Sequence, residues 1–335
     1  MKLGTPRWWY VRNGGPAPLT RALLTPISWL WAAATARRIA RTIPTEVGAP
    51  VICVGNITMG GAGKTPIVRE LLLTLNRRGV AAHGLSRGYG GKLKGPVRVD
   101  PARHTAADVG DEPLMLAQDF PMWVARDRAA GAIAASAAGA GAVVMDDGHQ
   151  NPSVRKALSL VVVDGETRGG EWPFGDGRVF PAGPMREPLE VGLARADAVI
   201  VLLPVDVEQP DFDLLVTFGD RPVLVARLES AAPVPTGPQV GFAGVGKPWK
   251  VEKALTAAGC QLVDFAPFPD HGAYSEATLN MLADRAKVYD AGLVTTEKDW
   301  VRLPPKWREK VTPWPVRARF DDEAALEELL AKAGL

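Results

Sequence analysis

A glycine-rich segment between an apolar strand and a helix constrains the fold of this chain more than any other feature. Residues 54–66 read VGNITMGGAGKTP, at the end of the apolar run 50–54 and leading into a helical stretch at 65–78. Glycines let backbone N–H groups turn inward around phosphate oxygens, and the helix N-terminus adds a favourable dipole. The sequence therefore predicts a nucleotide-binding loop, made by Thr58, Gly60, Gly61, Ala62, Gly63, Lys64 and Thr65.

The last two residues of this loop have separate expected roles. Lys64 should reach the β- and γ-phosphates of ATP and take part in catalysis, and Thr65 should hold Mg²⁺. The loop departs from the common G-x-x-x-x-G-K-[ST] pattern, because Thr58 stands at the first glycine position. The alternative is an ordinary glycine turn before a helix, but a Gly-Gly-Ala-Gly-Lys-Thr run after a buried strand argues against it.

The rest of the chain alternates short apolar runs with helical stretches, which predicts an α/β fold. We expect a P-loop NTPase-like, mostly parallel sheet with helices on both faces, followed by a second, smaller α/β domain. Residues 204–238 read as a connection with strand-like segments at 214–218 and 223–227. The expected division is an N-terminal region at 1–45, a P-loop domain at 46–205, and a second domain with a C-terminal helix at 206–335.

Composition narrows the class of protein further. The chain has 335 residues, 47% hydrophobic and 23% charged, which is typical of a globular protein with a sizeable core. Its net charge of +2 indicates no nucleic-acid partner. Two distant cysteines, Cys53 and Cys260, exclude a disulfide framework and fit a reducing compartment.

An apolar segment near the N-terminus, residues 22–36, lies between Arg21 and the basic run 37–41. It is shorter than the roughly 20 residues that span a bilayer, and Pro26 interrupts it. Tryptophans and leucines flanked by arginines suit a helix lying in the membrane interface. A helix packed on the core of its own domain explains the same residues, and the segment alone does not separate the two.

Several motifs in order resemble the tetraacyldisaccharide 4′-kinase family, the lipid A 4′-kinases of Gram-negative bacteria. The resemblance covers residues from about 50 to 303, and Thr58 in the loop is similar to the family's own pattern. The motifs are GNITMGGAGKTP (55–66), SRGYG (86–90), GDEP (110–113), DDGHQ (146–150), PAGPMRE (181–187), FAGVGKP (242–248), FPDH (268–271) and TTEKD (295–299).

This resemblance implies a kinase that moves the ATP γ-phosphate to the 4′-hydroxyl of a tetraacylated glucosamine disaccharide 1-phosphate. The product would be lipid IVA, in lipid A biosynthesis. The family acts at the cytoplasmic face of the inner membrane, which favours monotopic membrane association through residues 1–41. The partners implied are the acylated disaccharide lipid and the membrane surface, with no protein partner evident.

The resemblance also assigns Asp111 as the catalytic base and His271 as its partner. A sugar hydroxyl must lose a proton during transfer, and a carboxylate–histidine pair can accept it. Because His271 lies in the second domain, we expect that domain to close over the site. Without the resemblance, Asp111 reads as a helix N-cap and His271 as an exposed turn residue.

The double aspartate after the apolar run 142–145 fits a metal-binding role at a strand end. The metal-ligand hypothesis comprises Thr65, Asp146, Asp147 and Gln150, and the substrate hypothesis comprises Asn56, Arg128, Arg186 and Glu187. The two arginines are expected to clamp phosphates, with Glu187 orienting Arg186. The segment departs from the family pattern, because His149 stands at an apolar position and Asn151 where a histidine is expected.

Two other classes share some of these features. A P-loop ATPase or GTPase acting as a metallochaperone or partition switch would also carry glycines before Lys-Thr. The run 296–299, TEKD, superficially resembles a guanine-reading motif, but its spacing does not fit. A non-enzymatic membrane scaffold would need the segment 22–36 but not Asp111.

Overall fold

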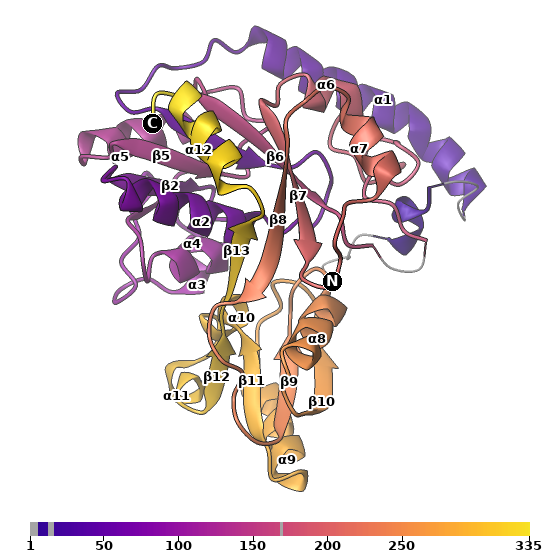
Figure 1. The fold of residues 1–335 in the computed structure, drawn as a ribbon, viewed down its shortest axis with the longest axis vertical. Coiled ribbons are helices and arrows are strands. Elements are labelled where there is room, and N and C mark those ends of the chain that lie inside the picture. The colour runs from indigo at the N-terminus through magenta and orange to yellow at the C-terminus, as the bar shows by residue number, and fades with distance from the viewer. Residues whose placement is uncertain (1–5, 13–16, 168–169) are drawn as a thin grey trace.

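The computed structural model describes residues 6–12, 17–167 and 170–335. Parts of the predicted N-terminal region, residues 1–5 and 13–16, lie outside the described residues. The described chain forms a large sheet flanked by helices and a small sheet below it (Figure 1). The predicted α/β class, with a mostly parallel sheet, is confirmed.

Within the described residues the large sheet has nine strands, in the order β13-β8-β7-β6-β1-β5-β2-β4-β3. Neighbouring strands are parallel except for the antiparallel pairs β13–β8 and β3–β4 at the edges. β1, which leads into the glycine loop, lies between β6 and β5. The strands are β1 Val51–Gly55, β2 Ala82–Ser86, β3 Val97–Arg98, β4 Met122–Val124, β5 Ala142–Asp146, β6 Leu158–Asp164, β7 Ala198–Pro204, β8 Val223–Ser230 and β13 Val316–Phe320.

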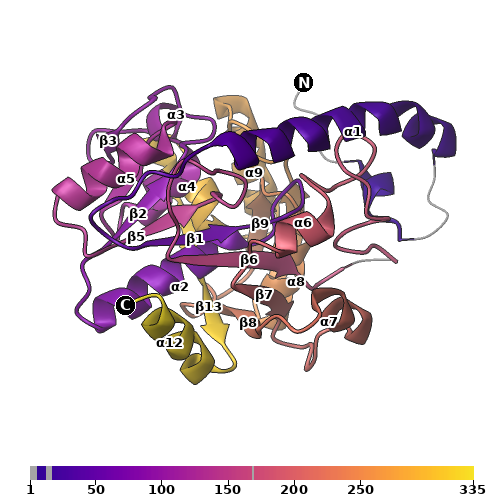
Figure 2. The same ribbon diagram turned by 90° about the horizontal axis from the view of Figure 1, so that it is seen from above.

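Alternate residues of these strands enter different hydrophobic clusters, so the sheet is covered on both faces. One face packs against α2 (Lys64–Arg77), α4 (Asp111–Leu116) and α12 (Glu323–Lys332). The other face packs against α5 (Arg128–Ala137), α6 (Leu189–Leu193) and α7 (Phe212–Phe218). Seen from above, α2 and α12 lie on the opposite side of the sheet from α5 and the long helix α1 (Figure 2).

The helix after the glycine loop is anchored by its buried face. Residues 67, 68, 71, 72 and 75 of α2 recur at helical spacing, and all five side chains are completely buried. Each such burial contributes about 1.5–3 kcal/mol, so the start of this helix is held firmly against the sheet.

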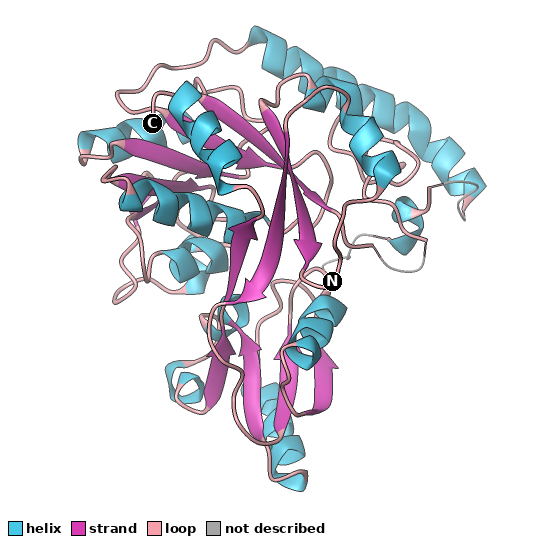
Figure 3. Ribbon diagram, viewed as in Figure 1, coloured by secondary structure: helices cyan, strands magenta, loops and turns pink. Residues whose placement is uncertain are grey.

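The small sheet consists, in the described residues, of four parallel strands in the order β10-β9-β11-β12. Its strands are β9 Gln239–Ala243, β10 Leu262–Pro267, β11 Gly292–Thr296 and β12 Val311–Trp314. The helices α8 (Pro248–Ala257) and α9 (Glu276–Val288) complete the unit, which stands apart from the large sheet in Figure 3. The remaining short helices are η1 Arg7–Tyr10, α3 Ala106–Val109, α10 Glu297–Trp300 and α11 Pro305–Arg308.

The two sheets divide the chain differently from the boundary expected at residue 206. β8, β13 and the C-terminal helix α12 belong to the large sheet and its core, so only residues between β8 and β13 form the small sheet. The prediction of a strand at 214–218 is wrong, because these residues lie in helix α7. Leu214 and Phe218, four residues apart, are buried on one helical face, and a short apolar run does not distinguish this pattern from a strand.

The large sheet and the helices that cover it are called the large unit below, and the small sheet with its helices the small unit. Helix α1 (Pro18–Arg41) packs one side against the large unit and exposes the other side. Arg21 forms an ion pair with Asp176 at 2.6 Å, and Ser28 accepts a hydrogen bond from the Ala182 backbone. The outer side carries exposed large apolar residues: Leu19, Leu23, Ile27, Trp29 and Leu30. Trp31 is also partly exposed, but it turns toward the protein, where its indole N–H donates to the Arg186 carbonyl at 3.0 Å. None of the helices in the described residues combines the length and apolarity needed to cross a bilayer.

Candidate active site

The glycine loop connects the end of β1 to the first turn of α2. Gly60 and Gly63 have φ values of 94° and 76°, which non-glycine residues rarely adopt. At Gly63 a Cβ atom would also lie 2.2 Å from the Leu202 side chain, so the helix start needs glycine for two reasons. Thr58 pairs as an antiparallel bridge with Met185, which ties the loop to the segment before Arg186.

Lys64, Asp147 and Arg186 meet beside this loop. Asp147 Oδ1 lies 3.3 Å from Lys64 Nζ and 2.7 Å from Arg186 Nη1. Burial opposes ionisation of Asp147, but the two cations outweigh it and hold the pKa of Asp147 well below its ordinary value. Arg186 Nε also donates to the carbonyl of Thr58 at 2.9 Å, so its guanidinium bridges the loop and the aspartate.

Asp146, at the end of β5, is buried, and its surroundings oppose ionisation of its carboxyl group. Burial, with the carboxylates of Glu112 and Asp147 nearby, raises the pKa of Asp146 to about 7. Its Oδ1 atom has no hydrogen-bond partner among the described residues. A divalent cation would satisfy this oxygen and favour its ionised form, so the residues present fit a Mg²⁺ ion. No group of three His, Cys, Asp or Glu side chains suited to a metal occurs in the described ranges.

Asn56 and Gln150, which were expected to contact substrate and metal, form hydrogen bonds to other groups of the protein. Asn56 is completely buried, donating to the Thr58 carbonyl at 2.9 Å and accepting from Lys64 Nζ at 3.3 Å. Gln150 donates to the Asn56 carbonyl and to Glu187, both at 2.9 Å. The amide oxygen of Gln150 faces Arg186 Nη1 at 3.3 Å. Both side chains therefore shape the loop, because their polar atoms are already hydrogen-bonded to protein groups.

Glu187 and Arg128, which were expected to contact substrate, also bind protein groups. Glu187 is buried and pairs with Arg195, 2.6 Å from each carboxylate oxygen, rather than orienting Arg186 directly. Arg128, at the start of α5, is buried, and its Nη atoms donate to the carbonyls of Ala125 at 2.7 Å and Asp146 at 3.5 Å. Arg128 thus supports the strand end that carries Asp146.

Asp111 and His271 come from opposite units and meet. His271 Nδ1 lies 2.8 Å from Asp111 Oδ2, and because an ionised carboxylate only accepts, Nδ1 carries the proton. Burial tends to raise the pKa of Asp111, but the hydrogen bond from His271 and the charges of Lys298 and Arg302 lower it below its ordinary value. His271 and Asp147 both have φ near 55°, at 55° and 53°, a costly conformation in a non-glycine residue.

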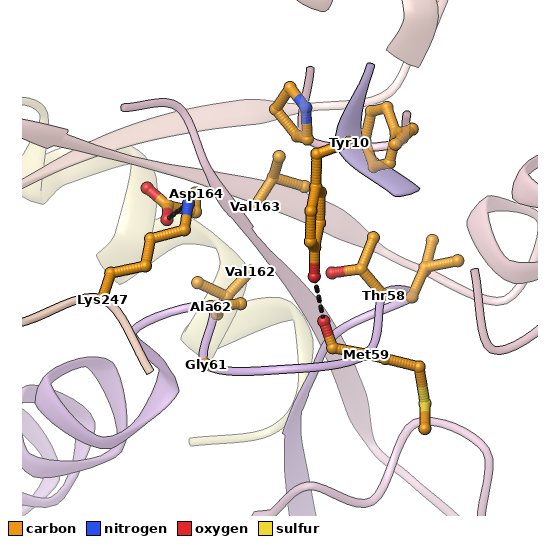
Figure 4. Close-up of a pocket in the computed structure, with 12 residues that line it drawn as sticks. Tyr10, Thr58, Met59, Gly61, Ala62, Val162, Val163, Asp164 and Lys247 are labelled. Carbon is orange, nitrogen blue, oxygen red and sulfur yellow. Dashed lines mark hydrogen bonds and ion pairs between the residues drawn. The ribbon is translucent and has the colours of Figure 1, made fainter. Parts of the chain in front are cut away.

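The small unit also touches the glycine loop itself. A Cβ atom at Gly246 would lie 3.6 Å from the Gly61 backbone nitrogen and 3.7 Å from Asp270 Oδ2. This links the loop to the segment that carries His271. Lys247 forms an ion pair with Asp164 at 2.7 Å. Figure 4 shows this pair beside Gly61 and Ala62. The small cavity there is closed on another side by Tyr10, whose hydroxyl donates to the Met59 carbonyl at 2.8 Å.

Ion pairs join the two units around the site. Arg69 on α2 binds Glu297 through both guanidinium Nη atoms, at 2.6 and 3.0 Å, and Lys298 binds Glu112 at 3.0 Å. Asp299 is completely buried, accepting from the Tyr274 hydroxyl at 2.6 Å and the Gly244 nitrogen at 2.9 Å. Asp299 therefore braces the small unit, and its carboxylate is not available to read a guanine base.

His149, which stands where the family pattern has an apolar residue, is buried beside β6 and α6. Its Nε2 donates to the Gly192 carbonyl at 2.8 Å, and its Nδ1 accepts from the Ser159 hydroxyl at 3.1 Å. Burial and the Lys156 ammonium lower the pKa of His149 to about 4, so the ring is neutral. The neutral ring makes two hydrogen bonds and packs against α6, at the position where the family pattern has an apolar side chain.

A phosphate loop at the end of a parallel strand, with Lys64, Arg186 and the aspartates converging on it, defines a P-loop phosphotransferase. The sequence profile described as LpxK, tetraacyldisaccharide-1-P 4′-kinase, matches residues 20–334. The chain belongs to this tetraacyldisaccharide 4′-kinase family and is a lipid kinase. The family prediction is confirmed, and the metallochaperone, partition-switch and scaffold alternatives are wrong.

Similar proteins support this assignment over the whole chain. A tetraacyldisaccharide 4′-kinase of Caulobacter vibrioides strain NA1000 is 86% identical over all of both chains. One of Phenylobacterium zucineum is 69% identical over 98% of this chain and 99% of the relative. The solved LpxK from Aquifex aeolicus in complex with ATP is 26% identical, with a TM-score of 0.76 over 94% of this chain and 99% of that one.

Sequence reasoning missed several residues around the site. Arg195 carries no motif, and it pairs with Glu187, eight residues earlier, on the other side of the short helix α6. Arg302 binds Asp299, and its Nε lies 3.8 Å from Asp111, although it follows the last recognised motif. Arg69 sits in the middle of a helix, where an arginine is ordinarily a surface residue. The TTEKD motif did signal Glu297 and Lys298, but nothing in it indicated their partners.

Proposed function

We propose that this chain transfers the γ-phosphate of ATP to the 4′-hydroxyl of a tetraacylated disaccharide 1-phosphate, with the Asp111–His271 pair accepting the hydroxyl proton. The observation that supports this most is the 2.8 Å contact between Asp111 and His271 across the two units. His271 Nδ1–H fixes the carboxylate, and the ring leaves Nε2 able to accept a proton. The tilted ring contact of Tyr89 with His271, 5.3 Å between centroids, holds the imidazole in place.

Lys64 and Arg186 supply the positive charge that phosphoryl transfer requires. Charge spreads over the equatorial oxygens of the transferring group, and fixed cations stabilise it without reorganisation. When bound, Mg²⁺ neutralises charge on the β- and γ-phosphate oxygens, and Thr65, Asp146 and Asp147 are the residues that would hold it. The clamping role of Arg128 toward a substrate phosphate stays a prediction, since its Nη atoms bind backbone carbonyls.

The function is tested by a transfer assay with γ-³²P-labelled ATP and the acylated disaccharide 1-phosphate in mixed micelles. We expect label at the 4′ position of the lipid, and none on glucosamine or on a deacylated disaccharide 1-phosphate. Label on the soluble sugars at an equal rate would contradict a lipid-directed site. ATP hydrolysis without any labelled lipid would contradict the kinase proposal.

We further propose that α1 places the enzyme on the cytoplasmic face of the inner membrane, as a monotopic protein. Leu19, Leu23, Ile27 and Leu30 recur at three- and four-residue spacing and are 51–79% exposed. Arg37 and Arg41 follow on the same helix, where they suit anionic headgroups. An exposed apolar stripe beside basic residues is typical of helices in the membrane interface.

The variant Leu23→Glu/Leu30→Glu should lose vesicle binding. Each removed side chain forfeits about 1.5–3 kcal/mol of burial, so partitioning should fall by about 100-fold or more. Flotation with anionic phospholipid vesicles measures this. Val288→Glu is a matched control, because Val288 on α9 is as exposed as Leu23, 77% in both cases. Unchanged flotation of the double variant would reject the membrane role of α1.

A further inference from the structure

A line of alternating charges runs from the helix α6 region to the phosphate loop. Arg195 Nη2 binds both oxygens of Glu187 at 2.6 Å, and Glu187 Oε1 accepts from Gln150 Nε2 at 2.9 Å. The other end of the same amide, Gln150 Oε1, faces Arg186 Nη1 at 3.3 Å. Arg186 in turn lies 2.7 Å from Asp147, which contacts Lys64.

Arg195 itself is fixed by the chain around it. It closely follows the end of α6, and its Nη1 donates to the Val191 carbonyl at 2.8 Å. Glu187 is only 1% exposed, so water does not solvate its carboxylate. A buried carboxylate of this kind requires a cationic partner. Arg195 is the cation that binds both of its oxygens, and the Lys156 ammonium interacts with it electrostatically.

The arrangement has a consequence for Arg186. A single amide group separates its guanidinium from the Glu187 carboxylate, and both charges lie in a poorly solvated region. Without Arg195, the field of Glu187 would draw Arg186 away from Asp147 and the Thr58 carbonyl, because Lys156 is held by the Gly148 and His149 carbonyls. Arg195 removes that attraction by neutralising Glu187 with two short hydrogen bonds.

We propose that Arg195 is a positioning residue of the kinase reaction, which neutralises Glu187 and so keeps Arg186 directed at the phosphate site. In this proposal Arg195 acts through Glu187, Gln150 and Arg186 rather than on the reacting atoms. This inference rests on the proposed role of Arg186, and it assigns a reason for an arginine that carries no recognisable motif.

The test compares Arg195→Ala with the double variant Arg195→Ala/Glu187→Gln in the labelled-ATP transfer assay. Misdirection of Arg186 should lower the kcat of Arg195→Ala about 10- to 100-fold, with the KM for ATP little changed. The double variant should recover much of this loss, because a neutral amide at position 187 no longer attracts Arg186. Arg195→Lys should retain an intermediate kcat, since it keeps the charge but not the planar fork.

Arg221→Ala is the matched control for packing around α6. Arg221 donates to the Leu193 carbonyl at 2.9 Å and to the Phe218 carbonyl at 3.0 Å, and no contact joins it to Glu187 in the described part of the chain. We expect its kcat to equal that of the wild type. Thermal unfolding of each variant separates loss of folded protein from loss of turnover.

Either of two results would overturn the inference. One is an Arg195→Ala enzyme that is less stable but turns over at the wild-type rate per folded molecule. The other is a double variant no faster than the single one, which would make the role of Arg195 purely structural. Wild-type turnover is measured in parallel, so failure of the kinase proposal itself would show as an inactive wild type.

Discussion

Lys64→Ala is expected to abolish phosphoryl transfer, lowering kcat by about 10³-fold or more. Lys64 Nζ is held 3.3 Å from both Asp147 Oδ1 and Asn56 Oδ1, at the start of the helix that follows the glycine loop. Without this cation, negative charge on the transferring phosphoryl group would lose a fixed partner next to the helix N-terminus. Transfer of label from ATP to the lipid, at saturating concentrations of both, measures the effect.

Lys332→Ala serves as the control for loss of a lysine. Lys332 is on α12 and forms a surface ion pair with Glu328, with two-thirds of its side chain exposed. This variant should transfer phosphate at the wild-type rate. Wild-type transfer by Lys64→Ala, with its fold verified by thermal unfolding, would refute the assignment of the loop.

Asp111→Asn should lower kcat by about 10²- to 10⁴-fold while leaving ATP affinity nearly unchanged. The substitution keeps the shape of the side chain but removes the basic oxygen that contacts His271. The neighbouring cations keep other partners, since Lys298 binds Glu112 and Arg302 binds Asp299. The fold should therefore tolerate the change. Steady-state kinetics together with equilibrium ATP titration distinguish a lost base from a lost binding site.

Two further variants belong to this experiment: His271→Gln tests the partner of Asp111, and Asp108→Asn is the control. Because Asp111 and His271 act as a pair, combining their substitutions should cost little more than Asp111→Asn alone. Asp108 lies three residues before Asp111 and caps α3 through Thr105, so Asp108→Asn should keep full turnover. A collapse of ATP affinity in Asp111→Asn would instead assign Asp111 a structural role.

Local sequence was sufficient for features whose physics is local. The glycine loop could be predicted because positive φ, inward N–H groups and a helix start all depend on a dozen consecutive residues. The apolar runs at β1, β5, β6 and β7 likewise marked buried parallel strands. The short strand β13 escaped detection, because Val316–Phe320 alternates with arginines and gains its partner, β8, only across a long sequence separation.

In the candidate site, too, local sequence did not predict which groups the side chains bind. Asn56 and Gln150 were expected to face substrate and metal because of their motifs, yet their amides are used inside the protein. Glu187 was expected to orient Arg186, and the fold supplies Arg195 instead. A motif identifies which side chains lie near a site, but hydrogen-bond partners depend on residues that converge from other strands and loops.

The sequence by itself determined the class of this protein: a nucleotide-binding loop, a parallel α/β fold and membership of a lipid kinase family. These follow from consecutive residues whose conformational and hydrophobic preferences act within one turn or one strand. Only the tertiary structure decided that Asp111 meets His271, that β13 and α12 return to the large sheet, and that Arg195 neutralises Glu187. The first two contacts join segments far apart in the sequence, where no local periodicity connects them. Glu187 and Arg195 are only eight residues apart, but their pairing depends on the burial of Glu187, which the whole fold decides.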